Sequence, residues 1–128
     1  EMAGTFANAE ALHLVSVPGL ADAGILEKMT SYGKITGASV YETLFWTGRF
    51  FEAALRQVNA PVVSRVSRVD IKRHLCGRVA AKDKDVRAAL LARFGGAATK
   101  GVSGHAWSAL AVAVTWWDRS AASLATSR

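Results

Sequence analysis

The run GILEKM at residues 24–29 decides how this sequence is interpreted, because it is short and mostly apolar and carries Glu27 near its end. Such a run predicts a short strand. A long helical pattern follows over about Val40–Val58, and the alternating run PVVSRVSR at residues 61–68 predicts a second strand. Strands that alternate with a helix favour an α/β fold with parallel pairing.

The long helical segment has one apolar face. Val40, Leu44, Phe51, Leu55 and Val58 follow helical spacing, and we expect them to form its buried stripe. Ser39, directly before them, is the expected N-cap. The neighbouring aromatic side chains at positions 46 and 50 are also more typical of a core than of a surface that stacks on bases.

Further helices are expected on both sides of the strands. They cover about Asn8–Val17, Asp70–Leu75 closed by Gly77, a segment from Asp83 to the stop at Gly95-Gly96, and His105–Arg119. Asp70 and Asp83 are the expected caps, with Val86, Leu90, Leu91 and Phe94 inside. The sequence therefore predicts a single α/β domain over residues 1–119, rich in helices with a small parallel sheet, and a flexible tail at 120–128.

Two strands are few for an open sheet, so a monomer of this chain would expose apolar surface to solvent. We expect a homodimer or a tight complex with another protein, with the contact near Pro61–Arg68 or the last helix. Trp116 and Trp117 are adjacent and cannot share one helix face, so one of them is expected to be exposed or at an interface.

Charge is concentrated in one part of the chain. The 128 residues have a net charge of +6 and a pI of about 10.0. Residues 65–93 hold nine Lys or Arg against Asp70, Asp83 and Asp85, which equals the whole surplus. A local basic patch favours binding to polyanions such as nucleic acid. The alternative is a solvated basic face that only confers solubility.

Several classes of protein are disfavoured. Cys76 is the only cysteine, so neither a disulfide framework nor a thiolate zinc site is expected, and a reducing cytoplasm fits. The longest apolar stretch, Ala106–Trp117, is too short to cross a bilayer, and we expect no membrane partner. The N-terminal residues do not have the pattern of a signal peptide.

Five blocks, in order, carry a resemblance to a known family. They are ILEKMTSYG (25–33), YET with WTGRF (41–50), DIKRHLCG (70–77), AKDKDVR (81–87) and HAWSAL (105–110). Together they resemble RuvC-like Holliday junction resolvase homologues of phage and bacterial type, which have the RNase H fold. The resemblance covers nearly the whole chain.

This resemblance implies a Mg²⁺-dependent endonuclease that acts on branched DNA, with two metal ions held by converging carboxylates. Glu27 matches the glutamate at the end of a later strand, and His105 matches an acidic or histidine ligand that opens the last helix. Both are the candidate catalytic and metal-binding residues. Ser108, one turn after His105, stands where some relatives have a second acid and cannot supply its charge.

The resemblance also shows a departure. Nothing before Glu27 matches the strand that carries the family's first Asp. The run VPG at 17–19 resembles the family's Asp-Pro-Gly, but Val17 stands in place of the Asp, and we interpret the similarity as a chance match. We therefore expect a reduced or truncated RNase H-like fold that cuts DNA weakly or not at all. The alternative is a phage-type inhibitor or a protein-interaction subunit of a nucleic-acid-processing complex.

Basic residues are the candidate contacts to DNA phosphates. They are Arg65, Arg68, Lys72, Arg73, Arg78, Lys82, Lys84, Arg87 and Lys100.

Overall fold

A computed structural model describes residues 10, 11, 13, 23–28, 37–56 and 62–126. The chain divides into two compact units, residues 6–65 and residues 66–128, the latter grouped with residues 1–5. Glu10, Ala11 and His13 are helical, and the rest of the helix predicted at 8–17 lies outside the described residues. The single domain predicted over residues 1–119 stays a prediction.

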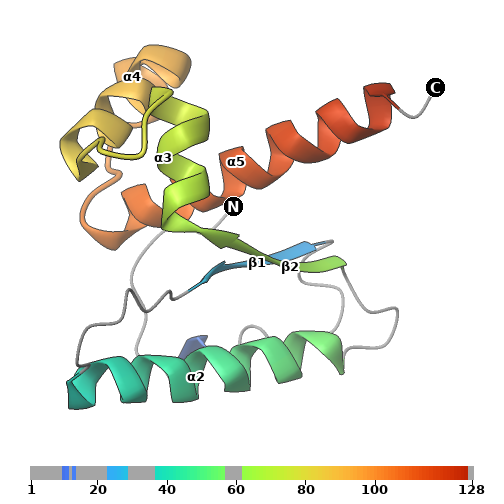
Figure 1. Ribbon diagram of the computed structural model, residues 1–128. Helices are drawn as coiled ribbons and strands as arrows, with labels where there is room; N and C mark the ends of the chain where they lie inside the picture. Colours follow the sequence, from blue (N-terminus) through green and yellow to red (C-terminus); the bar gives the residue numbers. More distant parts are fainter. Residues whose placement is uncertain (1–9, 12, 14–22, 29–36, 57–61, 127–128) are drawn as a thin grey trace. The chain divides into compact units, whose positions relative to one another are not determined.

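The first unit is a strand–helix–strand arrangement. Strand β1 (Ala23–Lys28) and strand β2 (Val62–Ser67) pair in parallel, and helix α2 (Ala38–Leu55) connects them (Figure 1). Parallel strands need such a crossover, because a tight turn can only reverse the chain. Both strands lie within one residue of their predicted ends, and the predicted class, helix-rich α/β with a small parallel sheet, is confirmed.

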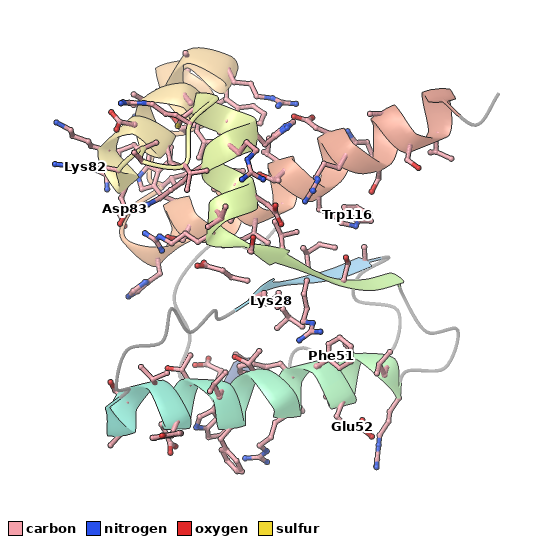
Figure 2. All side chains as sticks on the ribbon, in the orientation of Figure 1. Lys28, Phe51, Glu52, Lys82, Asp83 and Trp116 are labelled. Carbon is pink, nitrogen blue, oxygen red and sulfur yellow. The ribbon has the colours of Figure 1, made fainter. Side chains whose placement is uncertain are left out.

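Helix α2 packs on the sheet through a face that includes only part of the predicted stripe, and Val58 of that stripe lies outside the described residues. Ala54 is buried, and a Cβ added at Gly24 of β1 would lie 3.8 Å from the Ala54 Cβ. Figure 2 shows Phe51 pointing toward the sheet and Glu52 pointing away from it. Leu44 and Leu55, predicted to be buried, are 47% and 46% exposed. Two strands are too narrow to cover both flanks of a helix, so only the flank that holds Ala54 is buried.

The start of α2 also differs from expectation. Its N-cap is Gly37, which makes no side-chain cap, and Ser39 lies inside the helix. The hydroxyl of Thr43 donates to the carbonyl of Ser39 at 2.9 Å, so a side chain satisfies this early carbonyl from within the helix.

The second unit consists of three helices, α3 (Arg68–Cys76), α4 (Asp83–Ala98) and α5 (His105–Thr126) (Figure 1). Helix α3 contacts both α4 and α5. Ile71 of α3, Leu90 of α4 and Val112 of α5 are buried together with the small residue Ala81. Leu91 and Phe94, also predicted to be inside, are 39% and 40% exposed, because a helix on the edge of three buries only one narrow face.

Local chemistry sets the helix ends. Ser67 is the cap of α3, since its Oγ accepts the backbone N–H of Asp70 at 3.1 Å, so Asp70 itself is not the cap. Gly77 closes α3 with φ +73°, as predicted. The predicted stop at Gly95-Gly96 is a kink: Gly95 has φ +83° and α4 resumes to Ala98.

The last helix is longer than predicted. Helix α5 continues to Thr126, so the described part of the predicted tail is helical. Trp117 is 66% exposed, whereas Trp116 is half-buried, which agrees with the expected difference between the two. Across the residues that the structure describes, no helix is both long enough and apolar enough to cross a membrane.

Candidate nucleic-acid interface

The basic residues belong almost entirely to the second unit. Residues 66–128 contain eleven Lys or Arg against four Asp, whereas residues 1–65 contain five against six acids. Residues 66–128 therefore have a net charge of +7 (11 − 4), and residues 1–65 have a net charge of −1 (5 − 6). Such a concentration of positive charge in one compact unit is typical of a surface that binds polyanions.

Ion pairs connect the beginnings of α3 and α4. The Arg68 guanidinium pairs with the carboxylate of Asp83, the first residue of α4. Arg78 pairs with Asp85 at 3.3 Å, and the backbone N–H of Lys82 donates to the same carboxylate at 2.8 Å. This backbone hydrogen bond, helped by Arg78, lowers the pKa of Asp85. Asp83 is therefore not the cap of α4 but the partner of Arg68, and Lys82 takes the cap position.

Other cations of the predicted set are not engaged in this way. Within the described ranges, the side chains of Lys72, Arg73, Lys82, Lys84 and Lys100 form no ion pair. All except the half-buried Lys72 are exposed. Figure 2 shows Lys82 projecting from the start of α4 away from the three helices. These side chains can therefore reach a ligand without breaking a contact.

A pocket lies between the start of α4 and the start of α5. Its volume is about 230 Å³, and its lining residues are Asp83, Val86, Arg87, Gly104, His105, Trp107 and Ser108. The Arg87 guanidinium lies over the Trp107 ring, 5.5 Å from its centroid. Gly104 has φ +52°, which turns the chain so that His105 begins α5 beside the basic start of α4. The fold thus brings His105 together with Arg87 and Asp83, which are distant in the sequence.

A charged cluster joins all three helices. One oxygen of Asp118 on α5 accepts from Arg93 of α4 at 2.7 Å, and the other is shared by Arg93 and His74 of α3, the latter at 2.7 Å. The Arg93 hydrogen bonds, followed by that from His74, hold the pKa of Asp118 well below its ordinary value. Asp118 thus fixes the helices that present the basic residues.

A second ion pair joins the same helices. Arg119 of α5 lies 3.5 Å from Asp70 of α3, and hydrogen bonding with Ser67, assisted by Arg119, lowers the pKa of Asp70. The sequence analysis missed both clusters. The one available signal was Asp118, the single acidic residue of the mostly apolar α5.

The two candidate catalytic residues lie in different units. Glu27 is half-buried near the end of β1, as predicted, and His105 is exposed at the start of α5. In the ranges that the structure describes, no three His, Cys, Asp or Glu residues gather into a group that could hold a metal ion. Of the acids near His105, Asp83 is already engaged by Arg68. The donors around His105 therefore do not make up a metal centre.

Arg65 differs from the other predicted contacts. It belongs to the first unit, where its guanidinium lies 5.8 Å from the centroid of the Phe51 ring of α2. This contact gives Arg65 a role in packing within the strand–helix–strand arrangement.

Comparison with known proteins identifies the architecture. No family model matches the sequence, and no curated protein matches it. A solved structure does match, that of RuvC from Thermus thermophilus, with a TM-score of 0.61 over 84% of this chain at 21% sequence identity. This chain has a RuvC-like fold. The match covers 61% of the RuvC chain, so our chain spans about three-fifths of its length.

The RuvC-like fold confirms the resemblance as far as the fold is concerned. The five blocks that carry the resemblance lie on β1, on α2, on α3 with its Gly77 end, at the start of α4 and at the start of α5, except that residues 29–33 of the first block lie outside the described residues. Two blocks, AKDKDVR and HAWSAL, supply the walls of the Arg87–His105 pocket. At this level of identity the similarity supports the fold alone.

Proposed function

We propose that this chain binds DNA through its second unit, and that it derives from a structure-specific, metal-dependent endonuclease of the RuvC-like type. The observation that carries the proposal is the pair of exposed cations Lys82 and Lys84 at the start of α4, next to the Arg87–His105 pocket, in a segment (residues 66–128) with eleven basic and four acidic residues. Neutralising phosphates with such side chains releases counterions, which drives binding without any base contact.

The predicted cations contribute unequally under this proposal. Lys82 and Lys84 at the start of α4 and Arg87 one turn later contact phosphates directly. Arg68 and Arg78 contribute less, because each already pairs with a carboxylate of α4. The Trp107 ring holds the Arg87 guanidinium at the pocket. Because the side chain is already ordered there, it loses less conformational entropy when it binds a phosphate.

The proposed substrate is branched DNA, and the proposed cleavage activity is weak or absent. Two Mg²⁺ ions held close together need several carboxylates to offset their repulsion. Among the described residues, the resemblance offers Glu27 and His105 as ligands, and a neutral imidazole is a poor partner for Mg²⁺. The chain would then recognise the substrate of a phage or bacterial nuclease in the cytoplasm and cut it slowly, if at all.

A second candidate function rests on a different observation. Trp117 is 66% exposed on α5, and a large exposed aromatic residue is typical of a protein-binding surface. In that case the chain acts as an inhibitor or an interaction subunit of a nucleic-acid-processing complex. Its binding to that complex would respond weakly to salt, whereas binding to DNA must respond strongly.

A mobility-shift titration at several salt concentrations tests the proposal. The logarithm of the binding constant for duplex and four-way DNA should fall linearly with the logarithm of salt concentration, by roughly 0.9 per phosphate neutralised. The double substitution Lys82→Gln and Lys84→Gln should lower this slope by about 2. A charge-matched control, Arg49→Gln with Arg56→Gln on α2, should leave it unchanged. A binding constant that does not change with salt concentration would contradict the proposed DNA-binding function.

A further inference from the structure

We propose that the pocket between the starts of α4 and α5 takes one unpaired base of bound DNA, and that it favours a base with an amino group, such as cytosine. This inference rests on the proposed DNA binding and names the part of the DNA that the pocket recognises. All the lining residues belong to the second unit, so that unit forms the pocket by itself.

The size of the pocket suits a single base. Its volume of about 230 Å³ equals the space of roughly eight water molecules at about 30 Å³ each. Pockets that enclose drug-sized molecules are usually larger, about 300–1,000 Å³. One pyrimidine ring with its substituents therefore fits inside, whereas the sugar and the phosphate of the same nucleotide stay outside.

A cation held on an aromatic ring lines the pocket. The Arg87 guanidinium lies over the half-buried Trp107 ring, 5.5 Å from its centroid. Within the described part of the chain, Arg87 forms no ion pair. Unpaired bases stack on arginine guanidinium groups and on aromatic rings, so this pair offers a stacking partner to a base that enters.

The charge of the lining favours a base over a phosphate inside the pocket. Asp83 contributes a carboxylate, and one of its oxygens accepts from Arg68. An ionised carboxylate accepts several hydrogen bonds and donates none, so it repels a phosphate and attracts the amino group of cytosine. The hydroxyl of Ser108, also in the lining, can donate to the carbonyl oxygen of the same base.

The phosphates that flank the unpaired base have cations of their own beside the pocket. Lys82 and Lys84 lie on either side of Asp83 in the sequence, and both are exposed. Figure 2 shows Lys82 projecting from the start of α4. A DNA strand that contacts these lysines passes the pocket that Asp83 lines. A base without a pairing partner costs least to remove from the stack, so the pocket selects DNA that already contains one.

Binding of the full chain to three duplexes of equal length tests the pocket. One duplex carries a single unpaired cytosine, the second an unpaired thymine, and the third an abasic residue, which keeps the sugar and phosphate but has no base. At one low salt concentration, the cytosine duplex should bind roughly tenfold more tightly than the abasic duplex, the effect of one stacked base. The thymine duplex should lie between them, because thymine has no amino group.

Arg87→Lys tests the stacking partner, because lysine keeps the positive charge and lacks the planar group. The ratio of the abasic and cytosine dissociation constants should fall from roughly tenfold to about twofold or less. Arg49→Lys is the matched control. Arg49 also lies over a tryptophan ring, 4.6 Å from the centroid of Trp46, but it belongs to α2 in the first unit and should leave the ratio unchanged.

Photo-cross-linking locates the base directly. An iodocytosine at the unpaired position, which couples to a neighbouring aromatic side chain on irradiation, should form an adduct with Trp107 or His105 of the pocket. Mass spectrometry of the digested chain identifies the residue. An adduct confined to Trp46 or Trp117, which lie outside the pocket, overturns the proposal.

The three duplexes separate the failure of this inference from the failure of DNA binding. Equal affinities for the cytosine and abasic duplexes overturn the inference, because the two share the phosphate and differ in the base, and the DNA binding of the second unit then stands. Thymine bound as tightly as cytosine overturns the recognition of the amino group. If none of the three duplexes binds at low salt, the proposed DNA binding fails, and the inference fails with it.

Discussion

Asp118 of α5 and Arg93 of α4 form a two-point ion pair, in which each carboxylate oxygen accepts a hydrogen bond from the guanidinium. Because His74 of α3 donates to the same carboxylate, the three helices of the basic unit meet at a single side chain. Such shared, charge-assisted hydrogen bonds are stronger than isolated surface ion pairs. The arrangement of the proposed DNA-binding surface thus depends on a residue that lies outside it.

Asp118→Asn should destabilise the folded chain. The amide keeps the shape of the carboxylate but leaves Arg93 and His74 without their anion, and we expect a loss of about 1–2 kcal/mol in the free energy of unfolding. Urea unfolding followed by circular dichroism measures it. Glu52→Gln is the matched control, because it breaks only the exposed pair with Arg56 on α2 and should cost at most about 0.5 kcal/mol. If the two variants lost the same free energy of unfolding, the Asp118 cluster would stabilise the fold no more than an exposed ion pair does.

Stability should fall in acid, and Asp118 should account for part of the fall. Its pKa in the folded chain is lowered, as are those of Asp70 and Asp85. A carboxyl whose folded pKa lies below its unfolded value of about 3.9 stabilises the fold fully above that value. The contribution is lost as the pH falls from about 5 through the lowered folded pKa. Unfolding free energies measured between pH 7 and pH 2 should therefore decline less steeply in Asp118→Asn than in the wild type.

The kink in α4 provides a backbone test. Gly95 has φ +83°, a conformation that favours glycine, whereas Gly96 is exposed and a Cβ there meets nothing within 4 Å. Gly95→Ala should lower the free energy of unfolding by about 1 kcal/mol, and Gly96→Ala should leave it unchanged or raise it slightly. A larger loss of stability in Gly96→Ala than in Gly95→Ala would show that the kink does not lie at Gly95.

Cleavage of DNA should be weak or undetectable. Four-way, flapped and single-stranded DNA are incubated with the chain in Mg²⁺ and then in Mn²⁺, with Glu27→Gln beside the wild type. Strong cleavage that Glu27→Gln abolishes would contradict the expected inactivity and support the nuclease site. Cleavage that persists in Glu27→Gln would point to another site.

Sequence patterns predicted both strands, the first residues of α4 and α5, and the end of α3 at Gly77, whereas the caps of α2 and α3 and the ends of α4 and α5 differ from the predictions. Pattern identifies β1 and β2 because short apolar runs have few other uses, and Gly77 ends α3 because its conformation is costly for other residues. The buried face of α2 was predicted only in part: Phe51 points toward the sheet, whereas Leu44 and Leu55 are exposed because two strands cover only one flank of the helix. Asp83 and Asp85 both resemble caps in the sequence, and only the positions of Arg68 and Lys82 in the fold assign them different partners.

The candidate site was predicted in part. The concentration of charge in residues 65–93 is visible in the sequence, as is the position of His105 at a helix start. The pocket that joins His105 to Arg87, and the contact of Arg87 with Trp107, depend on how α4 and α5 pack. Pairs such as Arg93 with Asp118, twenty-five residues apart, have no local pattern that would reveal them.

The central claim is that DNA contacts the second unit and not the first. Amide resonances of the ¹⁵N-labelled chain, recorded during titration with four-way DNA at low salt, test it most directly. We predict progressive shifts for Lys82–Arg87 and for the start of α5 at His105–Ser108, with Ser39–Ala54 of α2 unaffected. Shifts confined to α2, or none at a DNA concentration that saturates a mobility shift, would contradict the account.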